Sequence, residues 1–173
     1  MERSSPTRVV CDAGPIIHLD ELNCLDLLAD FDPILVPECV CQEIARNRPE
    51  ALHQDHIQFT RTQTVLPGDI GFVALLRAFA LDAGEQEALA LVYRQPAAIL
   101  LTDDAAARLV AGQLGMRVHG TIGVLLRAVR RNLRTPAQVL SLLRQLPQRS
   151  TLYIRPSLLD RIIAQVQNEF GLD

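Results

Sequence analysis

Two adjacent carboxylates, Asp103 and Asp104, follow directly on an apolar run in the stretch ILLTDD. Neighbouring carboxylates repel each other, and each raises the pKa of the other when both are removed from water. A divalent cation relieves this repulsion, and oxygen ligands without histidine or cysteine suit Mg²⁺ or Mn²⁺ rather than zinc. The pair therefore indicates a metal site, although an Asp that ends a strand also commonly caps the helix that follows it.

Three further acids stand at similar junctions of the chain. Asp12 ends the apolar stretch RVVCD, and Glu43 lies about one turn into the helix predicted after the second strand. Glu85 opens a later predicted helix, where a carboxylate is also favourable simply because of the helix dipole. Glu87 lies two residues on, roughly 200° around that helix, so the two glutamates do not easily face one ion, and we prefer Glu85.

Strands and helices alternate along the chain, and this alternation must position the acids. Short apolar runs predict strands over residues 8–12, 33–37, 57–65, 97–102 and 116–120, with an edge strand over 151–155. Helical spacing predicts helices over residues 14–28, 38–47, 69–80, 84–95, 104–115 and 122–132, and two more that begin at 135 and 157. This pattern favours an α/β fold with a mainly parallel sheet covered by helices on both sides. In such sheets the active site lies beyond the carboxyl ends of the strands, where these acids would converge.

Length and composition limit the class of protein. The 173 residues are long enough for one domain with a substantial core, and we expect a single domain over 1–173. No apolar run reaches the roughly 18 residues of a membrane span, and the polar N-terminus lacks a signal-peptide core, so we expect a cytoplasmic protein without membrane partners. The four cysteines match neither zinc spacing nor a CxxC motif, which favours reduced thiols in the core.

Other phosphate-handling or hydrolytic sites of α/β proteins lack their motifs in this sequence. There is no GxGxxG, no GxxxxGK[ST] and no GxSxG, which excludes the usual dinucleotide, P-loop and nucleophile-elbow signatures. Response-regulator receivers need a lysine beside their acids, and this chain has none. The four histidines offer no candidate acid–base pair of the kind used by metal-independent ribonucleases.

Four stretches carry a family resemblance in the order in which they occur. VVCDAGPIIHL, ILVPECVCQEI, LDAGEQEALAL and ILLTDDAAARLVAGQLGMRVHGTIGVLL resemble a PIN domain, in particular an uncharacterised prokaryotic subfamily related to VapC-type toxins. The similarity spans about residues 9–132 and continues more loosely through the tail. It implies a three-layer α/β/α sandwich with a mainly parallel sheet of four or five strands. The core would cover about residues 8–132, with a helical C-terminal extension over about 135–173.

The resemblance also implies an activity and a set of residues. The activity is a Mg²⁺- or Mn²⁺-dependent endoribonuclease, the toxin component of a toxin–antitoxin pair, with a non-catalytic binding or regulatory module of the same fold as the alternative. Its catalytic acids would be Asp12, Glu43, Glu85, Asp103 and Asp104. All but Glu43 are expected metal ligands, and Glu43 is either a further ligand or a positioning group. Glu85 departs in residue type, because many PIN toxins carry Asp at that position.

Candidate contacts to RNA come from the basic part of the chain. Residues 1–104 hold 17 of the 20 acids, whereas residues 105–173 hold 10 of the 17 basic residues, all of them arginine. Arginine suits phosphate, so we expect RNA contacts from Arg108, which lies four residues after Asp104, and from Arg127 and Arg131 on one helix face. The Thr102 hydroxyl would bind a carboxylate or an RNA phosphate. The arginine stripe is alternatively a solvated face or a surface for an acidic antitoxin, and a second copy of the chain is a further candidate partner.

Overall fold

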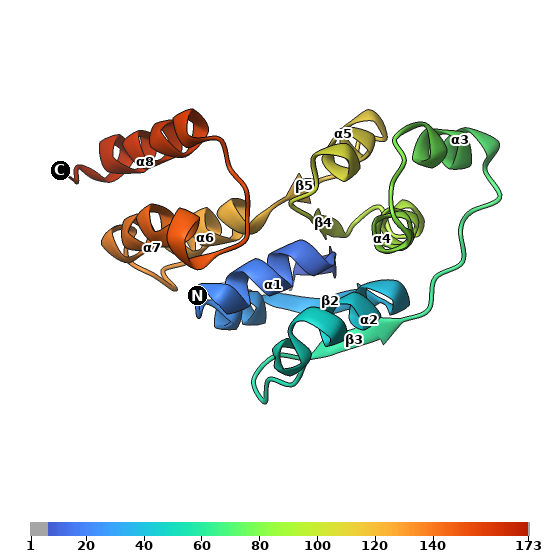
Figure 1. Cartoon of the computed structure of the whole chain (residues 1–173), viewed down its shortest axis with the longest axis horizontal. Helices are drawn as coiled ribbons and strands as arrows, with labels where there is room; N and C mark the ends of the chain where they lie inside the picture. The colour runs from blue at the N-terminus through green and yellow to red at the C-terminus, as the bar shows by residue number, and fades with distance from the viewer. Residues whose placement is uncertain (1–6, 173) are drawn as a thin grey trace.

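The computed structural model describes residues 7–172, which form one parallel sheet with helices on both faces (Figure 1). Residues 1–6 and 173, including most of the polar N-terminus considered above, lie outside the described residues. Five strands pair in the order β3-β2-β1-β4-β5, and every pairing is parallel. They are β1 (Thr7–Cys11), β2 (Phe31–Pro37), β3 (Phe59–Thr62), β4 (Ile99–Leu101) and β5 (Val118–His119). The expected α/β/α sandwich is confirmed.

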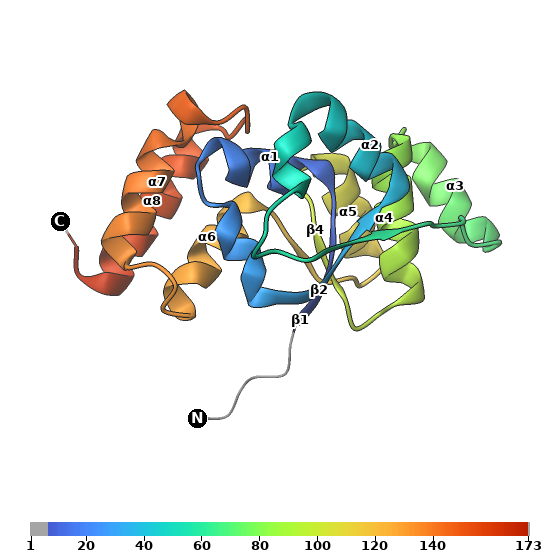
Figure 2. The ribbon, with the colours of Figure 1, turned by 90° about the horizontal axis from the view of Figure 1, so that it is seen from below.

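The helices connect these strands and extend the chain beyond the sheet. They are α1 (Ala13–Glu21), α2 (Glu38–Asn47), α3 (Ile70–Ala78), α4 (Ala83–Arg94), α5 (Ala105–Gln113), α6 (Thr121–Arg130), α7 (Pro136–Arg149) and α8 (Pro156–Phe170), with short 3₁₀ helices η1 (Leu25–Asp30) and η2 (Pro49–Leu52). In Figure 2 the strands run between the group α6, α7 and α8 on one side and α3, α4 and α5 on the other.

Alternation along the strands divides the apolar core between the two faces of the sheet. Val9 and Val36 point to a core shared with α1, α2, α6, α7 and α8. Val10 and Leu35 point to the opposite core, which α3, α4 and α5 cover. Successive strand residues face opposite sides, so strands buried on both faces must be apolar throughout, as the sequence indicated.

Two sequence-based expectations about elements are wrong. Residues 151–155 form no edge strand; they are the extended connection between α7 and α8. The Glu21 carboxylate accepts hydrogen bonds from Ser150 Oγ (2.9 Å) and from the Thr151 amide (2.7 Å), so polar groups of this segment bind α1 instead of a strand. The single helix expected over 14–28 is divided into α1 and η1, because Asn23 between them adopts a left-handed conformation with φ of 54°.

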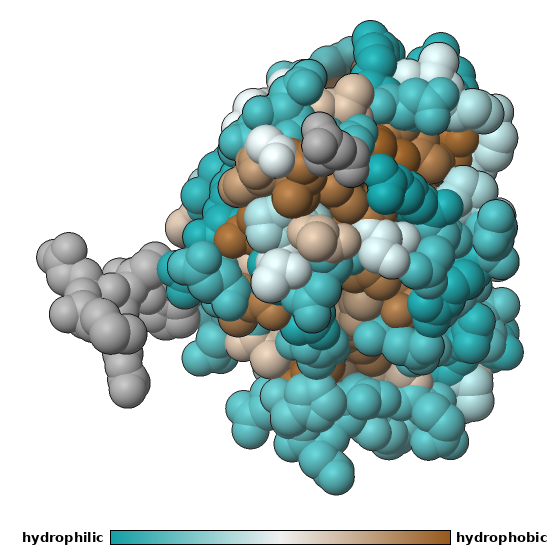
Figure 3. All heavy atoms as spheres, turned by 90° about the vertical axis from the view of Figure 1, so that its left-hand side faces the viewer, coloured by the Kyte–Doolittle hydropathy of each residue, from teal (hydrophilic) through white to brown (hydrophobic). Residues whose placement is uncertain are grey.

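The surface formed around α7 and α8 mixes polar side chains with apolar patches (Figure 3). No helix in residues 7–172 combines the length and the apolar character that a membrane crossing requires. Cys11, Cys24 and Cys41 are buried, as expected of core thiols, and Cys39 is partly exposed; all four are free.

Candidate active site

The carboxyl ends of β1 and β4 meet at one edge of the sheet, beside a cavity of about 300 Å³. The backbone amide of Asp12 donates to the carbonyl of Leu101 (2.9 Å), which fixes the two strand ends side by side. Six carboxylates line this cavity: Asp12, Glu43, Asp82, Glu85, Asp103 and Asp104. All five acids expected from the sequence therefore lie at one site, together with Asp82, and below we call this the acid cavity.

Asp12 is the most deeply placed of these acids, with 7% of its surface exposed. Its Oδ1 accepts from the Ala13 amide at the start of α1 (2.8 Å), and its Oδ2 accepts from the Thr102 hydroxyl (2.7 Å). The same hydroxyl accepts from the Asp104 amide (3.2 Å). Thr102 is itself buried, so its hydroxyl orients the chain around Asp12 and Asp104, and its side chain is not exposed to an RNA phosphate.

Several of the acids that line the acid cavity also cap helices. Asp104 Oδ1 accepts from the Ala107 amide (2.7 Å) and caps α5. Asp82 and Glu85 form a capping box at the start of α4, with the Glu85 amide donating to Asp82 (2.8 Å) and the Asp82 amide to Glu85 (2.9 Å). In residues 7–172 these bonds engage one carboxylate oxygen of each residue, which leaves the second oxygen of each for the cavity.

Sequence reasoning missed Asp82, although a usable signal was present. An Asp followed three residues later by a Glu is the signature of a capping box, and it fixes both residues at one helix start. Glu87 has a different environment from Glu85. Its carboxylate accepts from the Cys39 amide (3.0 Å) and contacts the Cys39 thiol (3.2 Å), so it joins α4 to α2. Glu85 lines the acid cavity and Glu87 does not.

Asp103 lines the acid cavity but directs its carboxylate to neighbouring helices. It accepts from the amide (2.8 Å) and the hydroxyl (2.6 Å) of Thr121 at the start of α6. Its Oδ2 also lies 2.8 Å from His18 Nδ1 on α1. A side chain at Gly120 would collide with this carboxylate, so the residue before Thr121 must be glycine for Asp103 to keep this position.

Burial and mutual repulsion raise several pKa values in the acid cavity. Burial raises the pKa of Asp12 to about 6, assisted by the charges of Glu43 and Asp82 and opposed by the hydrogen bonds from Thr102 and Ala13. Burial and the charges of Asp104, Asp82 and Asp12 raise the pKa of Glu85 to about 7, against the hydrogen bond from the Asp82 amide. Burial and the charge of Asp82 also raise the pKa of Glu43. The site thus concentrates six carboxylates, with His18 as the one basic side chain among its lining residues.

The chemistry of this donor set fits a hard divalent cation. Carboxylate oxygens are the ligands that Mg²⁺ and Mn²⁺ prefer, and positive charge would relieve the repulsion that raises these pKa values. Within residues 7–172 no three Asp, Glu, His or Cys side chains are already grouped as ligands of one ion.

The candidate RNA-binding arginines are divided between two regions. Arg108 of α5 donates to the carbonyl of Thr102 (3.2 Å) and remains exposed near the acid cavity. Arg127 and Arg131 bind Asp30 at 2.8 and 3.1 Å, and Arg127 also lies over the Phe31 ring, 4.8 Å from its centroid. Phe31 begins β2, so these two arginines lie toward the amino ends of the strands, away from the acid cavity.

Comparison with known proteins agrees with this architecture. A family model described as a PIN domain matches residues 8–168, which is nearly the whole chain and includes α7 and most of α8. A search of curated proteins found no match. The five-stranded parallel sheet, the helices on both faces and the match over 8–168 agree, and the chain belongs to the PIN domain family.

Proposed function

We propose that this PIN domain is a metal-dependent endoribonuclease whose active site is the acid cavity. PIN domains are generally nucleases that use divalent metal ions and act on nucleic acid. One observation carries the assignment to this site: six carboxylates from four parts of the chain line one cavity, with the buried Asp12 among them held at a raised pKa. Such an arrangement costs stability unless a cation binds there.

Asp12, Asp82, Glu85 and Asp104 are the residues that would hold Mg²⁺ or Mn²⁺. A bound ion of this kind acidifies water and neutralises charge at a phosphodiester. Thr102 orients Asp12 through its hydroxyl, so it acts as a positioning residue. Asp103 is a second positioning residue, because its bonds to Thr121 and His18 fix α6 and α1 around the cavity.

Glu43 and Arg108 have different roles in the proposed active site. Glu43 reaches the cavity from α2, and no hydrogen bond within residues 7–172 fixes its carboxylate, so it is free to bind the ion or a water near it. Arg108 is exposed and lines a hollow together with Asp103, so it would offset the charge of the phosphodiester as the strand approaches. Hydrolysis of this type would leave a 5′-phosphate and a 3′-hydroxyl.

Cleavage of labelled single-stranded RNA in Mg²⁺ or Mn²⁺ tests the proposal. We expect cleavage by the wild type, its loss in EDTA, and its loss in Asp12→Asn and Asp104→Asn. Asp55→Asn is the matched control, because Asp55 is exposed in a loop outside the acid cavity. A full panel of RNAs left uncut by a protein that still binds RNA would favour the non-catalytic binding module.

The same proposal includes the role of toxin in a toxin–antitoxin pair. The concentration of arginine in residues 105–173 supports it, since such a surface would attract an acidic antitoxin segment. Induced expression in bacteria should then arrest growth, and Asp104→Asn should remove the arrest. Growth arrest that persists in Asp104→Asn would separate toxicity from the acid cavity.

A further inference from the structure

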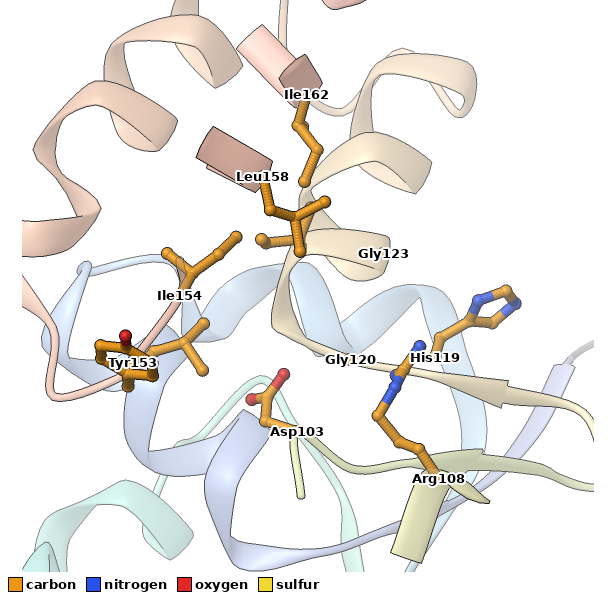
Figure 4. A pocket seen from close by; sticks show the side chains of 11 residues that line it. Asp103, Arg108, His119, Gly120, Gly123, Tyr153, Ile154, Leu158 and Ile162 are labelled. Atoms are coloured by element: carbon orange, nitrogen blue, oxygen red, sulfur yellow. The ribbon is translucent and has the colours of Figure 1, made fainter. Parts of the chain in front are cut away.

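A second hollow of about 300 Å³ lies between α6 and α8, next to the acid cavity. Figure 4 shows Asp103 at its centre, with Arg108 and His119 on one side and Tyr153 on the other. Its apolar wall consists of Ile122, Ile154, Leu158 and Ile162. The hollow thus combines an apolar wall, an exposed ring and an exposed guanidinium.

The two cavities adjoin each other at the connection between α7 and α8. Asp103, Leu152 and Tyr153 line both of them. Glu21 fixes this connection in place, since its carboxylate binds the hydroxyl of Ser150 and both the amide and the hydroxyl of Thr151. A polymer that crosses the acid cavity toward this connection would therefore also reach the hollow.

We propose that the hollow is a nucleotide subsite, in which a base stacks on Tyr153 and the adjoining phosphate binds Arg108 and His119. This inference rests on the proposed ribonuclease function and names where the strand lies beside the cleaved bond. A nucleotide carries a flat apolar face and an anionic phosphate, and the hollow offers a partner for each.

The state of Tyr153 supports a stacking role. The side chain is 84% exposed, although aromatic residues make up only 4% of the chain. The other tyrosine, Tyr93, instead packs against Phe72 with ring centroids 4.6 Å apart. Stacking on an aromatic ring accepts any base, so the subsite would favour single strands without strong sequence preference.

The exposed guanidinium of Arg108 favours a nucleotide over an apolar peptide segment in the same place, since the Asp103 carboxylate is already bound by Thr121 and His18. Arg108 donates one N–H to Thr102 and keeps the rest of its guanidinium exposed, and arginine is suited to phosphate. Beyond His119 and Gly123, which line this hollow too, a further hollow of about 320 Å³ contains Arg127, Arg130 and Arg131. Arg127 and Arg131 are paired with Asp30, so a strand that leaves the subsite along α6 would meet the positive charge of the exposed Arg130.

Binding of a short fluorescent single-stranded RNA by the full chain tests this subsite, with Asp104→Asn as the background so that the RNA stays intact. We expect Tyr153→Ala to weaken binding about 5- to 100-fold and Tyr153→Phe to bind within about twofold of the background. An RNA that carries abasic sites should bind with equal affinity to the background protein and to the background with Tyr153→Ala. Arg108→Gln should lower the salt dependence of binding by about 0.7 log units per log unit of salt, and the exposed Arg144→Gln should leave it unchanged.

Different outcomes separate the subsite from the ribonuclease activity. If Tyr153→Ala binds RNA as well as the background does, the subsite is wrong, and an apolar protein segment becomes the better occupant of the hollow. Equal losses on normal and abasic RNA would also overturn it, because stacking would not be the cause. If binding depends on the ring while the wild type never cuts RNA, the subsite stands and the ribonuclease proposal falls.

Discussion

Asp12→Asn should stabilise the metal-free protein at pH 8 and remove most of its stabilisation by Mn²⁺. Asp12 has a pKa raised from 3.8 to about 6, so between about pH 4 and 6 the folded protein holds a proton that the unfolded chain releases. Stability therefore falls as the pH rises through this window. Since one pKa unit corresponds to about 1.4 kcal/mol, ionised Asp12 costs the folded state roughly 3 kcal/mol at pH 8 as an upper limit.

Asparagine removes this cost and keeps the local structure. It is also a favoured N-cap residue, so it can replace the bond from Asp12 to the Ala13 amide. We expect the variant to be more stable than the wild type by about 1–3 kcal/mol at pH 8 in EDTA, and the two to be similar at pH 4. Mn²⁺ at about 100 times its Kd should then stabilise the wild type by about 2.7 kcal/mol and the variant far less.

Thermal and urea unfolding at pH 4 and pH 8, in EDTA and in Mn²⁺, measure these differences. Asp55→Asn is the control, and it should follow the wild type in all conditions because Asp55 is exposed outside the acid cavity. Equal Mn²⁺ stabilisation of wild type and Asp12→Asn would refute the placement of the ion. An Asp12→Asn variant that is less stable than the wild type at pH 8 without metal would refute the cost assigned to the buried charge.

Three further predictions concern residues around the acid cavity. Gly120→Ala should lower the free energy of unfolding by about 1–3 kcal/mol, because the added Cβ collides with Asp103; an unchanged urea midpoint would contradict this. Mg²⁺-dependent RNA cleavage should be weak below pH 5 and should rise toward pH 7 as Asp12 and Glu85 lose the protons that compete with the ion; a pH–rate profile that is flat from pH 5 to 8 would be inconsistent with it. Arg130→Gln should reduce the slope of log affinity against log salt concentration by about 0.7 for single-stranded RNA, with no loss of stability, since Arg130 is exposed and has no acidic partner in residues 7–172. Fluorescence titrations at several salt concentrations measure this slope, and an unchanged slope would contradict the prediction.

The edge of the sheet at which the acids lie could be predicted from the sequence because it depends on local patterns. Apolar runs mark the strands, and parallel strands bring their carboxyl ends to one edge, where Asp12 and Asp104 are expected. That the two acids lie close together depends on the pairing of β1 with β4, which the strand order of the structure shows. The position of Asp82 follows from an equally local rule, the capping box with Glu85.

Long-range polar contacts could not be predicted in the same way. Asp30 lies about a hundred residues before Arg127 and Arg131, and nothing in the spacing of the arginines indicates that an acid near the start of β2 binds both. Their role in RNA binding stays a prediction. The connection at Ser150 and Thr151 is similar, because Glu21 holds it from about 130 residues away, and the alternating residues that follow it resemble a strand.

The adjacent carboxylates Asp103 and Asp104 are compatible because they point to different partners. Asp104 uses one oxygen to cap α5 and leaves the other for the acid cavity, where an ion would bind. Asp103 is fixed by Thr121 and by His18. The two carboxylates therefore do not both present a free charge to the same ion. One carboxylate serves the proposed chemistry, and its neighbour fixes α1, which lines the acid cavity, and α6, which lines the adjoining hollow.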